Sequence, residues 1–189
     1  MKERMKKSMI SMAAVLFAAL MTTSVFTSCS KDDDNDEPKK AEFTKAAVTY
    51  TVTSDAATLG LFKVNVYGTD ADGNGFVETM SSPSYTKTVE IPVSKLPCTV
   101  QLYTVVTPLE DKVVTEAFDF NVQRKLDVMT LRSDNTVVDD KDHGNGIPYY
   151  DNPAGTSLSE FARKRNNDDP RLVIYIDANG NVTDQTKEK

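Results

Sequence analysis

The feature that most constrains the fold of this chain is an alternation of apolar and polar side chains that starts near Ala46 and returns at intervals up to Val128. Alternation with a period of two places the apolar residues on one face of a β-strand. The alternating apolar positions are Val48, Tyr50 and Val52; Phe62, Val64 and Val66; Val89, Ile91 and Val93; Cys98, Val100 and Leu102; Phe118, Phe120 and Val122; and Leu126 and Val128, with a shorter strand expected from Phe76 to Met80.

These runs predict a mainly β fold, an antiparallel β-sandwich of immunoglobulin-like arrangement over residues 45–131. Glycine, proline, asparagine and aspartate separate the runs, as turns between antiparallel strands require. A parallel α/β sheet needs helical crossovers, and the gaps between residues 54 and 125 are too short for them. A membrane barrel needs more strands and aromatic girdles. A sandwich of about 90 residues can bury a core of its own.

The remaining residues, 132–189, are expected to complete the domain with a loop, one short helix and a C-terminal strand. Residues 132–156 are polar and rich in turn formers, which indicates a long surface connection. Ser157 and Glu160 have the spacing of a helix capping box, so a short helix should begin there. Leu172–Ile176 is a compact apolar run, and we expect it to pair back onto the sandwich because such a short strand is not stable alone in water.

The N-terminus has the composition of an export signal. Lys2, Arg4, Lys6 and Lys7 are followed by an apolar run over 9–21 and by small residues before Cys29. The apolar run is shorter than the about 20 residues that span a bilayer. Residues 1–28 are therefore predicted to be a cleaved signal peptide.

The junction at Cys29 resembles a bacterial lipoprotein signal, in which the cysteine becomes the first mature residue and carries a diacylglyceryl group and an N-acyl chain such as palmitate. The residues after it, Ser30, Lys31, Asp32, Asp33 and Asp34, resemble the signal that directs lipoproteins of Bacteroidetes-type bacteria to the cell surface. This resemblance implies a lipid-anchored, surface-exposed protein of the outer membrane, with residues 29–44 as an acidic flexible tether. An ordinary secretory signal near Cys29 is the alternative.

The net charge limits the classes of partner, and the cysteine content limits the disulfides that the chain can form. Removal of residues 1–28 takes away four basic residues and one acidic residue, so the formal net charge changes from −6 to −9. Nucleic acid is excluded as a partner, because its binders present a basic face. With Cys29 lipidated, Cys98 has no second cysteine for an intramolecular disulfide, and we interpret it as a small core residue.

One motif suggests a metal. The segment from Asp70 to Glu78 matches the first part of a calcium loop of EF-hand type, and calcium is the one cofactor that the sequence raises. A serine stands at the twelfth place instead of the bidentate glutamate, and the flanks are strands. A tight hairpin is the favoured interpretation, because Asp-Gly and Asn-Gly provide positive φ angles. The calcium ligands would be Asp70, Asp72, Asn74, Phe76 through its carbonyl, and Glu78.

A second acidic group is Asp139, Asp140, Asp142 and His143. Its spacing does not define a metal site, and a solvated acidic loop is the favoured interpretation. His143 is the only histidine, and the chain has no nucleophile elbow, phosphate loop or zinc motif, so no enzyme is predicted. A glycoside hydrolase with a carboxylate pair is retained as an alternative, since that pairing is spatial.

A non-catalytic binding or structural module is the favoured class. The mature chain resembles surface lipoproteins of Bacteroidetes that display an immunoglobulin-like sandwich, and this implies glycan capture or adhesion, with outer-membrane lipid and a glycan or surface protein as partners. Tyr149 and Tyr150 could form an aromatic platform for a glycan, or could pack to anchor their own loop. Pilus-like assembly by strand exchange is the alternative, with Leu172–Ile176 as the displaceable strand.

The lipidation hypothesis predicts that Cys29→Ala abolishes the incorporation of labelled palmitate into the protein. The thiol is the only acceptor that the lipoprotein signal provides, so the variant should be exported without its anchor. Metabolic labelling of cells that express either form measures this. Equal labelling of the two forms would contradict the hypothesis.

Overall fold

Most of the apolar runs form strands, as the alternation predicts, in a computed structural model that describes residues 41–146 and 149–187. Two details of the predicted runs are wrong, because Val93 begins a 3-10 turn and Val122 begins the strand that holds Leu126 and Val128. The described residues belong to one compact unit, Lys39–Lys189. The predicted signal peptide, Cys29 and the predicted sorting residues Ser30, Lys31, Asp32, Asp33 and Asp34 lie outside the described residues. The first strand begins at Phe43, two residues before the predicted start of the sandwich at residue 45.

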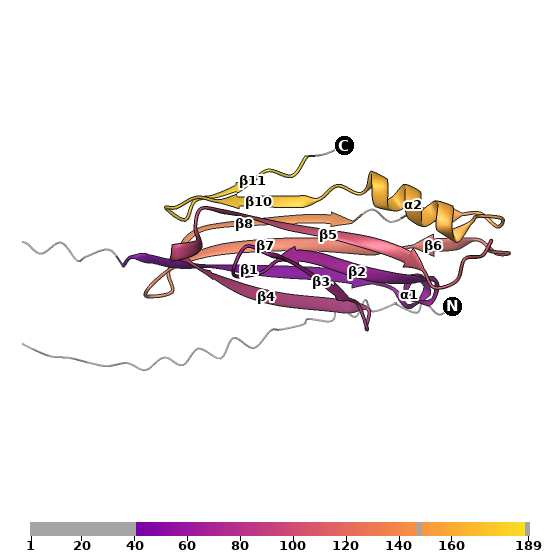
Figure 1. The fold of residues 1–189 in the computed structure, drawn as a ribbon, viewed down its shortest axis with the longest axis horizontal. Coiled ribbons are helices and arrows are strands. Elements are labelled where there is room, and N and C mark those ends of the chain that lie inside the picture. Colours follow the sequence, from indigo (N-terminus) through magenta and orange to yellow (C-terminus); the bar gives the residue numbers. More distant parts are fainter. Residues whose placement is uncertain (1–40, 147–148, 188–189) are drawn as a thin grey trace, which may run out of the picture. The chain divides into compact units, whose positions relative to one another are not determined.

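Two antiparallel sheets pack face to face (Figure 1). The four-stranded sheet has the order β4-β1-β7-β8, with β1 (Phe43–Ser54), β4 (Ser84–Pro92), β7 (Val122–Arg132) and β8 (Val137–Gly146). The five-stranded sheet has the order β11-β10-β5-β2-β3, with β2 (Phe62–Thr69), β3 (Gly75–Thr79), β5 (Cys98–Pro108), β10 (Leu172–Ile176) and β11 (Val182–Asp184). A small third sheet pairs β6 (Phe118–Phe120) with β9 (Tyr149–Asn152).

This order confirms the predicted mainly β antiparallel sandwich. Strand β1 lies between β4 and β7, and β5 lies between β2 and β10. In an immunoglobulin sandwich, strand B lies between A and E, and strand F lies between C and G. The place of strand A is therefore taken by β7, which comes later in the chain. Strand β10 pairs with β5 and β11 of the same chain, as expected for Leu172–Ile176.

The core lies between the two sheets and is formed by the apolar members of the alternating runs. Val48, Val64 and Leu102 are fully buried, and burial of such a side chain stabilises the fold by about 1.5–3 kcal/mol. Tyr50 is also fully buried, and its hydroxyl donates a hydrogen bond to the carbonyl of Thr69 across the sandwich at 2.7 Å. Burial raises the pKa of the Tyr50 phenol well above its ordinary value, so this side chain stays neutral.

Three helical segments connect the strands in the part of the chain that the structure describes. Helix α1 (Ala56–Leu61) begins at Asp55, whose carboxylate accepts the N–H of Thr58 at 2.6 Å. A 3-10 turn, η1 (Val93–Lys95), links β4 to β5. Helix α2 (Leu158–Asp168) begins at Ser157, whose hydroxyl accepts the N–H of Glu160, so the predicted cap is confirmed. No helix among the described residues is long and apolar enough to cross a bilayer.

The predicted surface connection over 132–156 is wrong. Residues 137–146 form β8, which pairs with β7 along most of its length, and residues 149–152 form β9. Strand β8 is an edge strand, and edge strands carry charged side chains that discourage pairing with other chains. Its residues include Asp139, Lys141 and His143, so the apolar alternation by which the other strands were recognised is missing.

A buried ion cluster fastens the C-terminal segment to both sheets. Arg124 of β7 donates to the carboxylate of Asp169 at 2.5 Å and to the carbonyl of Pro170 at 2.9 Å. Arg165 of α2 lies 2.6 Å from the other oxygen of the same carboxylate. The Arg124 and Arg165 side chains are 0 % and 1 % exposed. Burial lowers the pKa of Arg124 to about 10 and Asp169 opposes this shift, so the guanidinium is charged at neutral pH.

The helix is also fastened to β5 by an amide. The side chain of Asn166 accepts the N–H of Val106 and donates to its carbonyl, both at 2.9 Å. An amide side chain placed in this way continues the hydrogen bonding of a strand edge. Helix α2, β5 and β7 are therefore held together by polar contacts as well as by packing.

The ion cluster predicts that Asp169→Asn lowers the free energy of unfolding by about 3–5 kcal/mol, because two buried guanidinium groups lose the counterion that they share. Urea denaturation measures the change. Asp168→Asn is the matched control, since Asp168 is the exposed neighbour and makes no ion pair with any described residue. Equal stability of the two variants would show that the cluster does not stabilise the fold.

Candidate binding site

The candidate calcium segment forms the hairpin between β2 and β3. The carboxylate of Asp70 accepts the N–H groups of Asp72 at 2.9 Å and Asn74 at 2.8 Å. Gly73 has a φ of +83°, which residues with a side chain rarely adopt. Asp70 therefore closes the turn, and the hairpin interpretation is confirmed.

The other residues of the segment do not gather around a common point. Asp72 forms an ion pair with Lys95 at 3.0 Å, and Glu78 forms one with Lys87 on β4. The hydrogen bond from Lys87 lowers the pKa of Glu78. Phe76 pairs with Gly68 in the ladder, and its ring packs edge-on against Tyr50. Within residues 41–146 and 149–187, no three acidic, histidine or cysteine side chains are grouped as a metal site would require.

The second acidic group lies on β8, at an edge of the four-stranded sheet, and two of its members contact β11 of the other sheet. Asp139 accepts the N–H of Val182 on β11 at 2.8 Å, and His143 pairs with Asp184. Partial burial opposes ionisation of Asp184, but hydrogen bonds from Thr186 and His143 hold the pKa of its carboxyl below the ordinary value. Asp139 and His143 therefore connect β8 to β11, Asp142 pairs with Lys125 of β7, and the group lies in a strand instead of the expected loop.

The predicted aromatic platform at Tyr149 and Tyr150 falls in β9. The backbone of β9 pairs with β6, so these residues are in a strand instead of a loop. Their side chains lie outside the described part of the structure, and the platform there stays a prediction.

A different pair of tyrosines lies on the outer face of the five-stranded sheet. Tyr67 of β2 and Tyr103 of β5 are directly opposite each other in the antiparallel ladder. Their rings are stacked, with centroids 4.7 Å apart and planes 8° from parallel. The guanidinium of Arg171 lies over the other face of Tyr103, 4.4 Å from its centroid. Val77 of β3 is opposite Tyr67, so Arg171, Tyr103, Tyr67 and Val77 form one row across the sheet. We call this row the tyrosine row.

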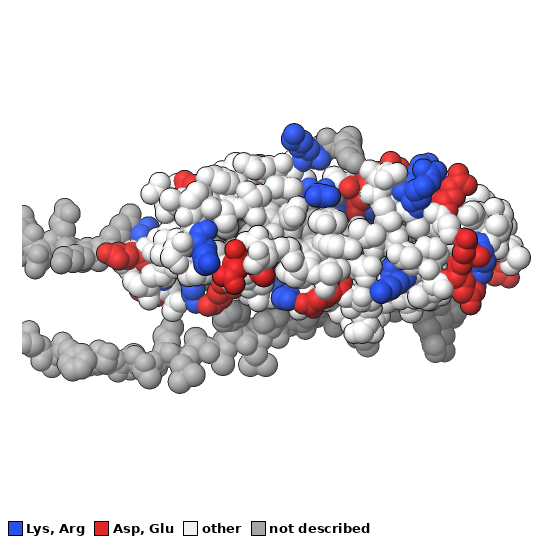
Figure 2. Space-filling view, in the orientation of Figure 1, with Lys and Arg blue, Asp and Glu red and all other residues white. Residues whose placement is uncertain are grey.

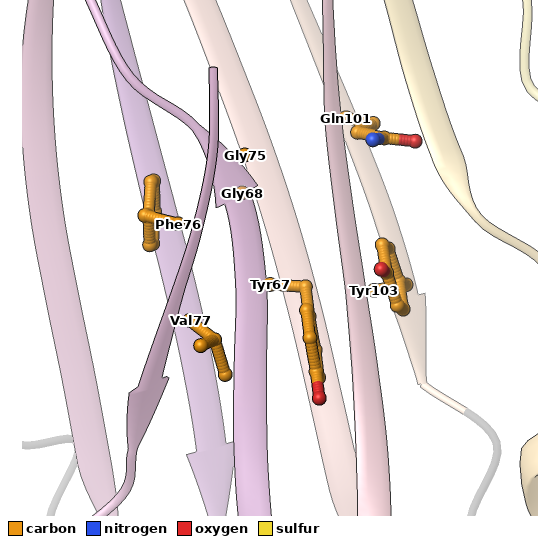
Figure 3. Close-up of a pocket in the computed structure, with 7 residues that line it drawn as sticks. All are labelled: Tyr67, Gly68, Gly75, Phe76, Val77, Gln101 and Tyr103. Atoms are coloured by element: carbon orange, nitrogen blue, oxygen red, sulfur yellow. The ribbon is translucent and has the colours of Figure 1, made fainter.

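A hollow of about 180 Å³ lies beside the tyrosine row (Figure 3). The ladder between β2 and β5 ends at Tyr67 and Tyr103, and farther along β2 the hydroxyl of Thr69 accepts the N–H of Gln101. Gly75 has no side chain to fill the space. The lining residues are Tyr67, Gly68, Gly75, Phe76, Val77, Gln101 and Tyr103.

Gly68 leaves room for the ring of Phe76, which lines this hollow. A methyl group added at Gly68 would lie 2.4 Å from the ring of Phe76, so only glycine fits without moving that ring. Phe76 in turn lies on the inner side of β3, while Tyr67 and Tyr103 project from the outer side, as Figure 3 shows. The two sides of the sheet therefore have separate roles, packing on the inner side and presentation of aromatic rings on the outer side.

A second hollow, of about 390 Å³, lies at the loop before β6. It is lined by Leu61 and by residues 112–118, among which Val113 is 59 % exposed. Its lining offers aliphatic side chains and lysine and glutamate tips, with no stacked aromatic rings. The smaller hollow has the more specific geometry, since aromatic faces and an amide lie together there.

The residues at the tyrosine row offer hydrogen-bonding groups and apolar ring surfaces. Gln101 supplies an amide, the tyrosines supply hydroxyl groups and apolar ring surfaces, and no carboxylate, histidine or cysteine is among the residues that line the hollow. Cys98 is half-buried elsewhere on β5, and burial raises the pKa of its thiol, which disfavours the reactive thiolate.

Comparison of the chain with models of protein families, with curated proteins and with solved structures finds no match.

Sequence reasoning missed Tyr67, Tyr103 and Arg171. A signal was present, because Tyr67 and Tyr103 both occupy the polar positions of alternating runs and are aromatic there. Two aromatic residues that should face water indicate a binding surface only when they are neighbours. Their alignment depends on the register of β2 against β5, which the alternation does not determine.

The turn geometry predicts that Asp70→Ala lowers the free energy of unfolding by about 1–2 kcal/mol, because two turn N–H groups lose their acceptor. The loss should be equal in chelator and in millimolar calcium, as measured by urea denaturation. A loss seen only in calcium would instead support the calcium loop.

Proposed function

We propose that this protein is a lipid-anchored cell-surface module that binds glycans without catalysis, through the tyrosine row. The observation that supports this most is the stacked pair Tyr67 and Tyr103 on an outward sheet face, beside a mainly apolar hollow that also holds the amide of Gln101. The membrane anchor is proposed from Cys29 and the residues that follow it.

Sugars match such a surface. A pyranose ring presents apolar C–H groups on one face and hydroxyl groups at its edge, so it can pack on an aromatic ring while it exchanges hydrogen bonds around it. Tyrosine suits this contact, because it offers a large rigid surface with few torsions to immobilise. Gln101 stands beside the rings to accept and donate hydrogen bonds.

The rings are held in place before any ligand arrives. Their spacing follows from the ladder that joins β2 to β5, and Arg171 packs on the far side of Tyr103. Preorganised side chains lose little conformational entropy on binding, so more of the contact energy appears as affinity. A flat rigid row on a sheet is thus suited to an extended chain of sugars.

The tether gives the sandwich reach from the membrane. Residues 29–42 precede β1, and fully extended they span at most about 50 Å. Several acyl chains on Cys29 would hold the protein at the membrane, since one chain alone gives only marginal binding. A binding face at the end of such a tether can meet polymers outside the cell.

The proposal predicts that the mature chain, made without lipid as the Cys29→Ala variant, binds at least one glycan on an array, and that Tyr67→Ala in that background weakens this binding about 10-fold or more. The reason is loss of the stacking surface. Met129→Ala is the control, because it removes an exposed apolar side chain, 43 % exposed, from the other sheet.

Thermal melting of the three proteins should show that Tyr67→Ala is still folded. The proposal is wrong if no glycan binds, or if Tyr67→Ala and Met129→Ala bind equally well.

A further inference from the structure

We infer that the tyrosine row selects acidic polysaccharides that carry carboxylates, and that Arg171 is the residue that recognises the carboxylate. This inference rests on the proposed glycan binding and names the class of glycan. It follows from the distribution of charge on the outer face of the five-stranded sheet and from the surroundings of Arg171.

The outer face of this sheet differs in charge from the rest of the chain. The whole chain has 28 acidic and 22 basic residues. Yet in the described strands β2, β3, β5, β10 and β11, no position that alternates outward from the core holds aspartate or glutamate. Lys63 is the cation at such a position, and Arg171 stands just before β10. Figure 2 shows few charged side chains over β5 and β2.

Four carboxylates that neighbour this sheet are engaged elsewhere, whereas Asp168, at the end of α2, is exposed and forms no ion pair with a described residue. Glu78 is opposite the buried Val66, so it lies on the other side of β3, where it pairs with Lys87. Asp72 pairs with Lys95. Asp169 is held in the buried ion cluster, and Asp184 pairs with His143. None of these groups neutralises the tyrosine row.

Arg171 has the properties of a carboxylate receptor. Its guanidinium is stacked on Tyr103, and it forms no ion pair with any residue in the described part of the chain. Stacking occupies the face of the guanidinium and leaves the N–H groups at its edge to donate. Two parallel N–H groups match the two oxygens of a carboxylate, a contact stronger than a neutral hydrogen bond. Since Pro170 is bonded to Arg124, the backbone that bears Arg171 is fixed.

Lys63 is a second cation on this face, as a polymer with carboxylates at regular intervals would require. Lys63 is on the same face of β2 as Tyr67, about 13 Å farther along the strand. It also forms no ion pair with a described residue. A polymer of uronic acids presents carboxylates at regular intervals, so one chain could contact Arg171, stack on the tyrosines and reach Lys63. A single small anion would use only one of these groups.

The test uses the mature chain as its lipid-free Cys29→Ala variant, with three polyuronates as probes: polygalacturonate, alginate and hyaluronate. Fully methyl-esterified polygalacturonan is the matched neutral polymer, and heparin is the sulfated one. At least one polyuronate should bind, and polygalacturonate should bind about 10-fold more tightly than its ester. The preference should fall when salt rises from about 0.1 M to about 1 M.

Substitutions of Arg171 and Lys63 test which residues cause the preference for polygalacturonate over its ester. Arg171→Gln should remove most of it, Arg171→Lys should keep part of it because the charge stays while the planar fork is lost, and Lys63→Gln should reduce it. Lys141→Gln is the matched control, since it removes an exposed lysine from β8, outside this face, and should change nothing.

The outcomes are distinguishable. If the protein and the Tyr67→Ala variant bind no glycan of any kind, the proposed function itself fails. If neutral and acidic polymers bind equally and Tyr67→Ala abolishes both, glycan binding stands and the acidic selectivity is overturned. Tighter binding of heparin than of every polyuronate, or an unchanged preference in Arg171→Gln, would also overturn it.

Discussion

The buried cluster of Arg124, Asp169 and Arg165 is the interaction on which the C-terminal half of the structure depends. Two guanidinium groups share one carboxylate inside the protein, an arrangement that costs much free energy if any member is missing. Arg124 belongs to the four-stranded sheet, whereas Asp169 follows the helix that lies on β5 of the other sheet. Buried charges need partners in a defined geometry, so the cluster fixes where α2 ends and where β10 can begin. Packing of aliphatic side chains alone would specify these positions less sharply.

The same cluster positions the candidate site. Arg124 also binds the carbonyl of Pro170, and the next residue is Arg171, whose guanidinium covers Tyr103. The order of contacts then continues through the ladder from Tyr103 to Tyr67 and on to Val77. A surface that we propose to be functional is in this way supported by a polar network behind it. The core residues on the inner side of the same strands hold the sheet flat against its partner, and Gly68 lets Phe76 close the inner side without disturbing the outer one.

The sequence predicted some parts of this structure well. Most of the alternating runs became strands, and Ser157 caps its helix because the cap depends on residues three positions apart. It failed at β8, whose Asp139, Lys141 and His143 suit an edge strand and give no apolar period. The aromatic platform predicted at Tyr149 and Tyr150 stays a prediction, and the sequence did not reveal the stacked pair Tyr67 and Tyr103, which comes from separate strands.

In this protein, features that depend on neighbouring residues followed from the sequence, whereas features that depend on strand order and register did not. The sequence by itself determined the strand faces, the helix start, the Asp70 turn and the residues that resemble a lipoprotein signal, since each depends on neighbours within a few positions. Only the tertiary structure decided that β7 takes the place beside β1, that Asp139 joins the sheets, and that Arg171, Tyr103 and Tyr67 form one row. These depend on strand order and register, which are set by the summed packing of both sheets and by the buried ion cluster, and no local pattern encodes them.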